Sequence, residues 1–175
     1  MRARILCISL LLASAIVNAD SGVLTKIVDG DTVYFQSKSK IAKCRLEYLD
    51  TPESSNNRKN KKDVSQCKNV SEKDMKSAGG SATRHAKSLL KLNNKYEYDI
   101  KGQDHYGRSI CVVHNGNKTF NEQMVIDGYA SIFRYYMNQN ELSYYESLLQ
   151  KAKHDRVGLW KDRFEIMMCL DKARK

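Results

Sequence analysis

The sequence is poor in proline and lacks the short motifs of several protein classes. One proline, Pro52, stands among 175 residues. There is no glycine-rich Walker loop and no Cys-x-x-Cys or Cys/His spacing of the kind that holds zinc. No isolated serine or cysteine has the surroundings of an activated nucleophile. The histidines His85, His105, His114 and His154 are scattered, and we interpret them as structural or surface residues.

Long apolar runs are absent after the N-terminal segment, and no later stretch is apolar enough to span a bilayer. Arg2 and Arg4 precede a short apolar run, which small residues close before Asp20. This pattern predicts a secretory signal peptide over residues 1–19, cleaved after Ala19. The alternatives are a membrane anchor, for which the run is short, and a lipoprotein modified at Cys7. The protein is therefore expected to be secreted or periplasmic, with no stable membrane association after cleavage.

Acidic residues are outnumbered, with 30 Lys and Arg against 20 Asp and Glu and a net charge of +10. A small, secreted and basic protein is suited to a polyanionic partner such as nucleic acid, anionic lipid or a wall polymer. Charge alone does not choose among these partners, and a soluble protein that happens to be basic remains an alternative. The length beyond the leader fits one domain that can bury a core.

Four cysteines follow the leader: Cys44, Cys67, Cys111 and Cys169. Export to an oxidising compartment permits disulfides, and two bridges allow three connectivities. Cys44 and Cys111 lie in apolar strand patterns, so they are expected to be core neighbours, either bridged or merely packed. Cys67 and Cys169 lie in polar stretches, where a bridge would hold a loop and the tail. The favoured pairing is 44–111 with 67–169.

The order of predicted elements indicates a small barrel. Strands are expected at 23–28, 31–36, 41–49, 95–101, 110–114 and 129–133, and helices at 81–92, 121–127 and 138–160, with a hairpin at Asp29-Gly30. Residues 54–80 are rich in Ser, Asn and Lys and predict a long mobile surface loop. Residues 163–175 predict a charged tail. The fold class is α+β, mainly β: a five-stranded OB-fold barrel with three helices, in a domain spanning 20–162.

Two acidic turns carry the candidate chemistry. Asp29 and Asp31 flank Gly30, while Asp50 and Glu53 flank Thr51-Pro52. Carboxylates on separate loops can converge on a hard divalent cation, and the proline restrains Thr51 so that its carbonyl can join them. Glu53 would then lie within reach of a water molecule, as a general base must. Taken separately, Asp29-Gly30-Asp31-Thr32 is better explained as a hairpin turn, and the Asp50 to Glu53 stretch is explained as a helix or turn start.

Two arginines complement these acids. Arg45 lies in the strand leading to Asp50, and Arg108 follows Tyr106-Gly107 in a turn. A guanidinium group offers parallel hydrogen bonds to phosphate and remains charged at any relevant pH. As alternatives, Arg45 is a surface residue of a strand and Arg108 is the tip of a hairpin.

Four fragments in order, VDGDTVYF, CRLEYLDTPES, DHYGRSICVV and FNEQMVIDGYA, resemble the thermonuclease family of staphylococcal nuclease-like proteins. The resemblance covers roughly Val23 to Trp160. It implies an OB-fold endonuclease, dependent on Ca²⁺, that acts on DNA and RNA with little sequence specificity and is expected to be monomeric. The alternatives are a non-catalytic OB-fold nucleic-acid-binding protein and a wall- or lipid-binding protein.

Residue roles follow from this resemblance. It implies that Asp31, Asp50 and the Thr51 carbonyl hold calcium, with Asp29 close to the metal. It implies that Glu53 is the general base and that Arg45 and Arg108 bind the scissile phosphate. Tyr106 and Tyr135 would bind the nucleotide. The chain departs from the family in having His105 where a lysine is frequent and Arg134 where a pocket tyrosine is usual.

Overall fold

The computed structural model describes residues 19–38 and 40–173. The expected signal peptide falls almost entirely on residues 1–18, outside the described residues. Within the described part of the chain, no helix is both long enough and apolar enough to cross a membrane.

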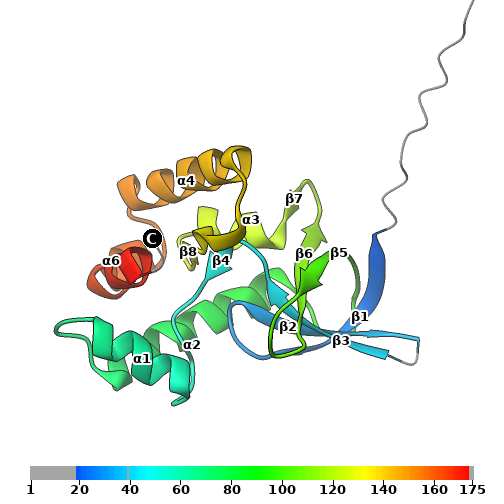
Figure 1. Cartoon of the computed structure of the whole chain (residues 1–175), viewed down its shortest axis with the longest axis horizontal. Helices are drawn as coiled ribbons and strands as arrows, with labels where there is room; N and C mark the ends of the chain where they lie inside the picture. Colours follow the sequence, from blue (N-terminus) through cyan, green and yellow to red (C-terminus); the bar gives the residue numbers. More distant parts are fainter. Residues whose placement is uncertain (1–18, 39, 174–175) are drawn as a thin grey trace, which may run out of the picture.

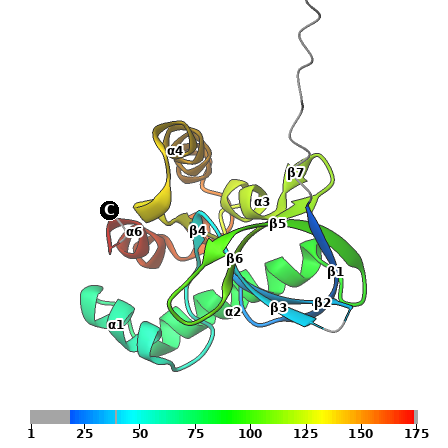
Figure 2. The same cartoon turned by 45° about the vertical axis from the view of Figure 1, so that its right-hand side comes forward.

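A closed barrel forms the β part of the molecule (Figures 1 and 2). Its strands are β1 (Asp20–Ile27), β2 (Thr32–Ser37), β3 (Lys40–Leu46), β5 (Lys95–Gln103) and β6 (Ser109–Asn115). Neighbouring strands pair in the order β3-β2-β1-β5-β6, and a parallel pairing of β3 with β6 closes the ring. The predicted five-stranded OB-fold barrel is thus confirmed.

Alternating side chains fill the barrel because successive strand residues point to opposite faces. Leu24, Val33, Phe35, Cys44 and Leu46 are each at most 1% exposed. The pairing of β2 with β3 places Thr32 opposite Arg45, and the parallel closure places Arg45 opposite Ile110. The turn after β1, the end of β3 and the start of β6 therefore meet at one end of the barrel.

Two helices occupy residues 54–80 and beyond, so the predicted mobile loop was wrong. Helix α1 (Arg58–Gln66) starts at Asn57, whose side chain accepts a hydrogen bond from the Asn60 amide. Helix α2 (Glu72–Leu89) starts at Ser71, which caps the Asp74 amide, and it is far longer than the helix predicted at 81–92. Its buried face is made of small residues with one methionine, a pattern that carries little hydrophobic signal.

The remaining elements come after the barrel strands along the chain. They are β7 (Lys118–Thr119), α3 (Phe120–Ile126), β8 (Ser131–Ile132), a 3-10 turn (Arg134–Tyr136), α4 (Gln139–His154), α5 (Leu159–Asp162) and α6 (Phe164–Ala173). The strand predicted at 129–133 is reduced to β8, which pairs with β4 (Leu49–Asp50). The described chain therefore holds six α-helices, three more than predicted.

Helix α6 replaces the predicted charged tail, and buried contacts hold it in place. Ile166, Met167 and Leu170 are at most 4% exposed. Asp171 is also buried and accepts hydrogen bonds from Lys153 at 2.6 Å and Arg134 at 2.7 Å. Burial alone would raise the pKa of Asp171, but the hydrogen bonds from these two cations lower it.

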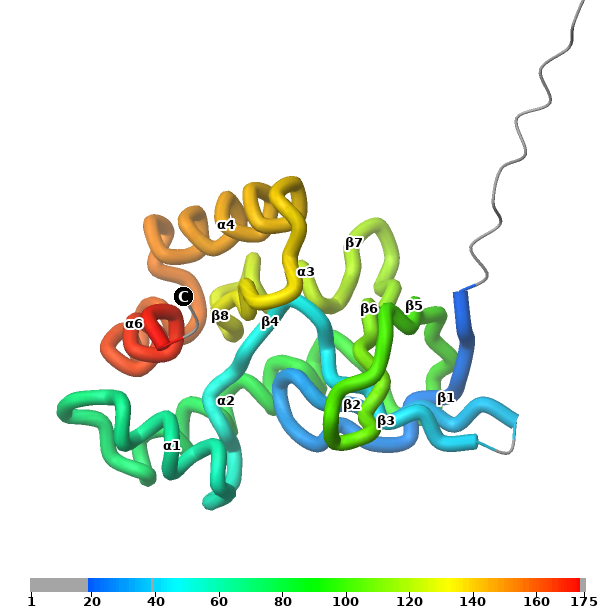
Figure 3. Tube along the Cα trace, in the orientation of Figure 1, coloured from blue at the N-terminus to red at the C-terminus, as the bar shows by residue number. Residues whose placement is uncertain are grey.

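Both expected disulfides are present. Cys44 and Cys111 join β3 to β6 at the parallel closure. Cys67 and Cys169 join the end of α1 to α6, and Figure 3 shows these two helices side by side. Helix α1 is otherwise polar, since its buried residues are Asn60 and Asp63. Apart from the backbone, the Cys67–Cys169 bridge is therefore the covalent link between α1 and the rest of the described domain.

Candidate active site

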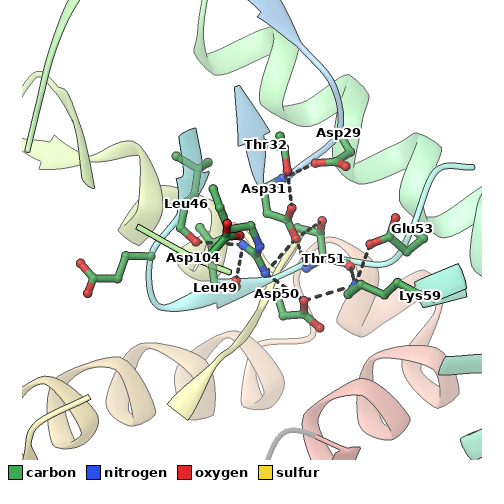
Figure 4. A network of polar contacts seen from close by, with 12 residues as sticks. Asp29, Asp31, Thr32, Leu46, Leu49, Asp50, Thr51, Glu53, Lys59 and Asp104 are labelled. Carbon is green, nitrogen blue, oxygen red and sulfur yellow. Dashed lines mark hydrogen bonds and ion pairs between the residues drawn. The ribbon is translucent and has the colours of Figure 1, made fainter. Parts of the chain in front are cut away.

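Polar side chains from four segments meet beside the open end of the barrel (Figure 4). The turn between β1 and β2 supplies Asp31, and β3 supplies Arg45. The chain leaving β4 supplies Asp50, Thr51 and Glu53. Helix α1 supplies Lys59, which was not among the predicted site residues.

Asp31 is 3% exposed and its carboxylate is fully engaged. The Thr32 hydroxyl donates to Oδ1 at 3.0 Å. The backbone amide and hydroxyl of Thr51 donate to Oδ2 at 3.2 and 3.1 Å. These bonds tie the β1–β2 turn to the segment that follows β4, so the two acidic turns of the sequence share one site.

Arg45 uses both of its terminal nitrogens at the site, and Nη2 bridges the two acids. Its Nη1 donates to the carbonyls of Leu46 and Leu49 at 2.8 and 2.9 Å. Its Nη2 lies 3.1 Å from Asp50 Oδ1 and 3.3 Å from Asp31 Oδ2. A planar fork suits this arrangement, which fixes the guanidinium against two buried carboxylates.

Glu53 is held at the site by its carboxylate and its backbone. Asn57 donates to Oε2 at 2.5 Å, and the Lys59 amine lies 2.8 Å from Oε1. Gly79 of α2 packs on the Glu53 backbone so closely that a Cβ there would be 2.3 Å from the Glu53 carbonyl carbon. The residue is 7% exposed, so the direction of its side chain is set by these neighbours.

Asp29 and Asp31 respond in opposite directions to this crowded environment. Burial, followed by the neighbouring charge of Asp31, raises the pKa of Asp29. Burial would also raise the pKa of Asp31, but the charges of Arg45 and Lys59 lower it below the ordinary value. Asp29 Oδ1 accepts a hydrogen bond from the Asp31 amide at 3.1 Å. Asp31 is therefore the acid of this pair that ionises more readily.

A cavity of about 520 Å³ opens beside these residues. Its wall includes the predicted residues Arg45, Asp50, Tyr106 and Arg108, together with Tyr136. Tyr135 is 81% exposed and does not line the cavity, so the structure places its neighbour at the pocket. The remaining lining side chains include the cations Arg58, Lys59 and Lys62 of α1.

Arg108 is positioned by Asp104, an acid that the sequence reading missed. Asp104 Oδ2 accepts from the Arg108 side chain at 2.8 Å, and its Oδ1 accepts from the Arg108 and Tyr106 amides. The guanidinium carbon lies 5.6 Å from the centre of the Tyr106 ring. Arg108 therefore lies in a turn that the Asp104 hydrogen bonds hold in place, and the side chains of this turn line the same cavity as Arg45.

Residues 43–162 match the family model described as staphylococcal nuclease homologue. The chain belongs to this family. The matched segment of the staphylococcal nuclease homologue contains Arg45, Asp50, Glu53 and Arg108, while Asp29 and Asp31 precede it. The resemblance inferred from the sequence is thus confirmed.

Several relatives of the chain carry nuclease names. A micrococcal nuclease of Shigella flexneri is 28% identical over 150 residues, which cover 81% of this chain and 74% of the relative. A thermonuclease of Staphylococcus intermedius is 24% identical over 85% of this chain and 80% of its own length. An uncharacterized protein of Methanocaldococcus jannaschii is 32% identical over 79% of this chain and 70% of its own. Family and relatives together support a nuclease.

The carboxylate and carbonyl oxygens at the site are of the kind that binds a hard cation, although in this structure they contact cationic side chains. Asp50 Oδ1 and the Thr51 carbonyl each lie 3.3 Å from the Lys59 amine, and Asp31 Oδ2 is 3.3 Å from Arg45. Calcium prefers such carboxylate and carbonyl oxygens. Within residues 19–38 and 40–173, no group of three or more His, Cys, Asp or Glu side chains is arranged to hold a metal. A metal at this site would therefore have to compete with Lys59 for these oxygens.

Several residues at the site escaped prediction because they depend on α1 or on a turn. Asn57, Lys59 and Asp63 belong to the stretch read as a loop. The i,i+4 spacing of Lys59 and Asp63 was the available helical signal. Asp104 stands four residues before Arg108, a spacing that a tight turn brings together.

Proposed function

We propose that the protein is a Ca²⁺-dependent endonuclease that hydrolyses phosphodiester bonds of DNA and RNA with little sequence specificity. The observation that carries the proposal is the convergence of acids and arginines beside one cavity. Asp31 and Asp50 both contact the guanidinium of Arg45, and Arg45, Asp50 and Arg108 are linked by a common cavity wall. Such a cavity can receive a phosphate while carboxylates stand behind it.

The proposed roles follow from this placement. Glu53 accepts a proton from the attacking water as the water oxygen bonds to phosphorus. The bond from phosphorus to the sugar oxygen breaks, and that oxygen leaves with the electron pair and takes a proton from solvent. Arg45 and Arg108 stabilise the negative charge that builds on the phosphate oxygens. Asp31, Asp50 and the Thr51 carbonyl would hold calcium, which when bound neutralises a phosphate oxygen and helps to place the water.

Substrate binding is proposed to be largely electrostatic. Arg58 and Lys62 of α1 line the cavity next to the arginines, and the aromatic rings of Tyr106 and Tyr136 lie on its wall. Cations bind the sugar-phosphate backbone without reading sequence, and aromatic faces stack on any base. Contacts to the backbone make binding independent of sequence. Stacking on aromatic rings favours single-stranded or frayed nucleic acid, in which the faces of the bases are exposed.

The test is hydrolysis of single-stranded DNA, double-stranded DNA and RNA with Ca²⁺ and then with a chelator. Glu53→Gln is expected to lower turnover by about 10²-fold or more, the scale of a lost general base. Glu97→Gln, an exposed carboxylate on β5, makes the same charge change and is expected to leave turnover unchanged. Degradation unaffected by the chelator would contradict the calcium requirement.

Two other results would point elsewhere. Retention of DNA without any degradation would indicate a non-catalytic binding protein, and neither retention nor degradation would favour a wall- or lipid-binding protein. The proposed export is tested separately, by sequencing the N-terminus of the protein recovered from the periplasm and the medium. It is expected to begin at Asp20 and to elute as a monomer.

A further inference from the structure

Lys59 occupies the centre of the oxygens that a metal would need. Its amine lies 2.8 Å from Glu53 Oε1, 3.3 Å from Asp50 Oδ1 and 3.3 Å from the Thr51 carbonyl oxygen. Asp63 Oδ2 is a fourth oxygen neighbour at 3.4 Å. Figure 4 shows the amine between the carboxylates of Asp50 and Glu53. A single ammonium thus contacts two of the three predicted calcium ligands and the predicted general base.

Helix α1 is built to deliver this amine. Asn57 caps the helix through the Asn60 amide and also donates to Glu53, so the helix start is fixed against the site. Asp63 lies one turn after Lys59 with its side chain fully buried. The bridge from Cys67 to α6 fixes the other end of the helix. The lysine is therefore held from both ends of α1.

An ammonium and a divalent cation cannot share these oxygens at contact distance. Calcium takes six to eight oxygen ligands at roughly 2.3–2.6 Å, which leaves no room for an amine about 3 Å from the same atoms. Two cations at such separation also repel strongly in a partly buried site. The Lys59 side chain is 33% exposed, so water is accessible to the amine when it leaves the acids.

We propose that Lys59 is a tethered cation that competes with the divalent cation for Asp50, Thr51 and Glu53, so that metal binding requires withdrawal of its amine. This inference rests on the proposed function, since it concerns the same site. In the absence of metal the amine neutralises the buried acids and occupies Glu53 Oε1. Its withdrawal frees that oxygen to accept a proton and leaves the amine in the cavity that receives the phosphate.

The first test measures binding of Ca²⁺ alone by titration calorimetry on the disulfide-intact protein. Lys59→Gln is expected to bind Ca²⁺ about tenfold more tightly than the unmodified chain, because the competing charge is removed. Lys61→Gln is the matched control: this lysine is exposed on the same helix and does not line the cavity. Its Ca²⁺ affinity should stay within about twofold of the unmodified value, since it lies among screened surface charges. Equal or weaker binding by Lys59→Gln would overturn the proposal.

A second measurement needs no substitution and so does not depend on the variant folding. The unmodified protein is acylated with an amine-reactive ester with and without Ca²⁺, and the rate at each lysine is read by mass spectrometry. Labelling of Lys59 is expected to accelerate severalfold with Ca²⁺, while that of Lys61 stays constant. An unchanged Lys59 rate at saturating Ca²⁺ would show that the amine is not displaced.

Hydrolysis assays on the same samples separate this inference from the proposed function. If the unmodified protein degrades DNA with Ca²⁺ but Lys59→Gln gains no affinity, the nuclease stands and the competition fails. If Lys59→Gln binds Ca²⁺ more tightly but no sample degrades nucleic acid, the competition stands and the nuclease proposal fails.

Discussion

Removal of the bridge between Cys67 and Cys169 should lower stability strongly and loosen α1 first. The cysteines are 102 positions apart in the sequence. Loop-closure entropy for a ring of that size corresponds to ~4.7 kcal/mol of stabilisation at 25 °C, of which strain and residual structure remove a part. We therefore expect Cys67→Ser/Cys169→Ser to lower the free energy of unfolding by about 3–4 kcal/mol in urea titrations.

The local effect separates this bridge from its partner. Helix α1 buries Asn60 and Asp63 rather than large apolar side chains, so few packing contacts remain when the tether is cut. Amide exchange of α1 is expected to quicken in the double variant well below the global unfolding transition. Cleavage of nucleic acid should fall as well, because α1 carries cavity-lining cations.

The matched control is Cys44→Ser/Cys111→Ser, which removes the other bridge, across a sequence separation of 67. The entropic cost by the same formula is ~4.4 kcal/mol, nearly equal, but this bridge joins β3 to β6. Its loss should quicken exchange at the barrel closure and leave α1 protected. Protection of α1 that survives loss of the 67–169 bridge would refute the reasoning and show that polar contacts alone hold the helix.

Three further substitutions test other parts of the site and fold. Arg45→Lys keeps the charge but loses the planar guanidinium that reaches four oxygens. We expect the free energy of unfolding to fall by roughly 2 kcal/mol in denaturation and the turnover to fall at least about tenfold in hydrolysis assays. Wild-type values of both would show that charge alone suffices. Gly79→Ala should destabilise by about 2 kcal/mol although alanine favours helices by about 1 kcal/mol, because its Cβ would overlap the Glu53 backbone; thermal melts check this, and a gain in stability would contradict it. Asp171→Asn should cost roughly 2 kcal/mol at pH 7 by urea denaturation. The pKa of Asp171 is lowered in the folded protein, so the stability difference between the two proteins should be complete at pH values above 3.8, the ordinary pKa of an aspartate, and should vanish as the pH falls through the lowered pKa. A stability difference that stays constant down to about pH 2 would contradict the ion-pair account.

The barrel and the Cys44–Cys111 bridge were predictable because their signals are local and periodic, whereas Cys67 and Cys169 were paired only as the two cysteines in polar stretches. Alternating strands, the Asp29-Gly30 hairpin and the placement of Cys44 and Cys111 in apolar patterns all point to the same architecture. The acids and arginines were predictable as a set from motif order. Their actual contacts, such as Arg45 with the Leu46 and Leu49 carbonyls, require backbone positions that no sequence pattern specifies.

The helices of residues 54–80 were missed for a physical reason. The buried face of α2 includes Ala78, Gly79 and Ala82, small residues that pack closely but resemble a flexible polar stretch in a hydropathy reading. Helix α1 has almost no apolar face, and the Cys67–Cys169 bridge together with polar contacts at Lys59 and Asn57 holds it instead. The role of Lys59 could not be predicted, because it depends on where this helix lies.

The pairing of β3 with β6 also makes catalysis a reporter of folding. Arg45 lies on β3 and Arg108 immediately precedes β6, so the two guanidinium groups face one cavity only after these strands have joined. Chains truncated before residue 109 lack the closing strand and cannot assemble the pocket. Pairing between distant segments is a slow kind of step, and regain of hydrolysis after dilution from denaturant should follow the time course of that step rather than the faster appearance of helix.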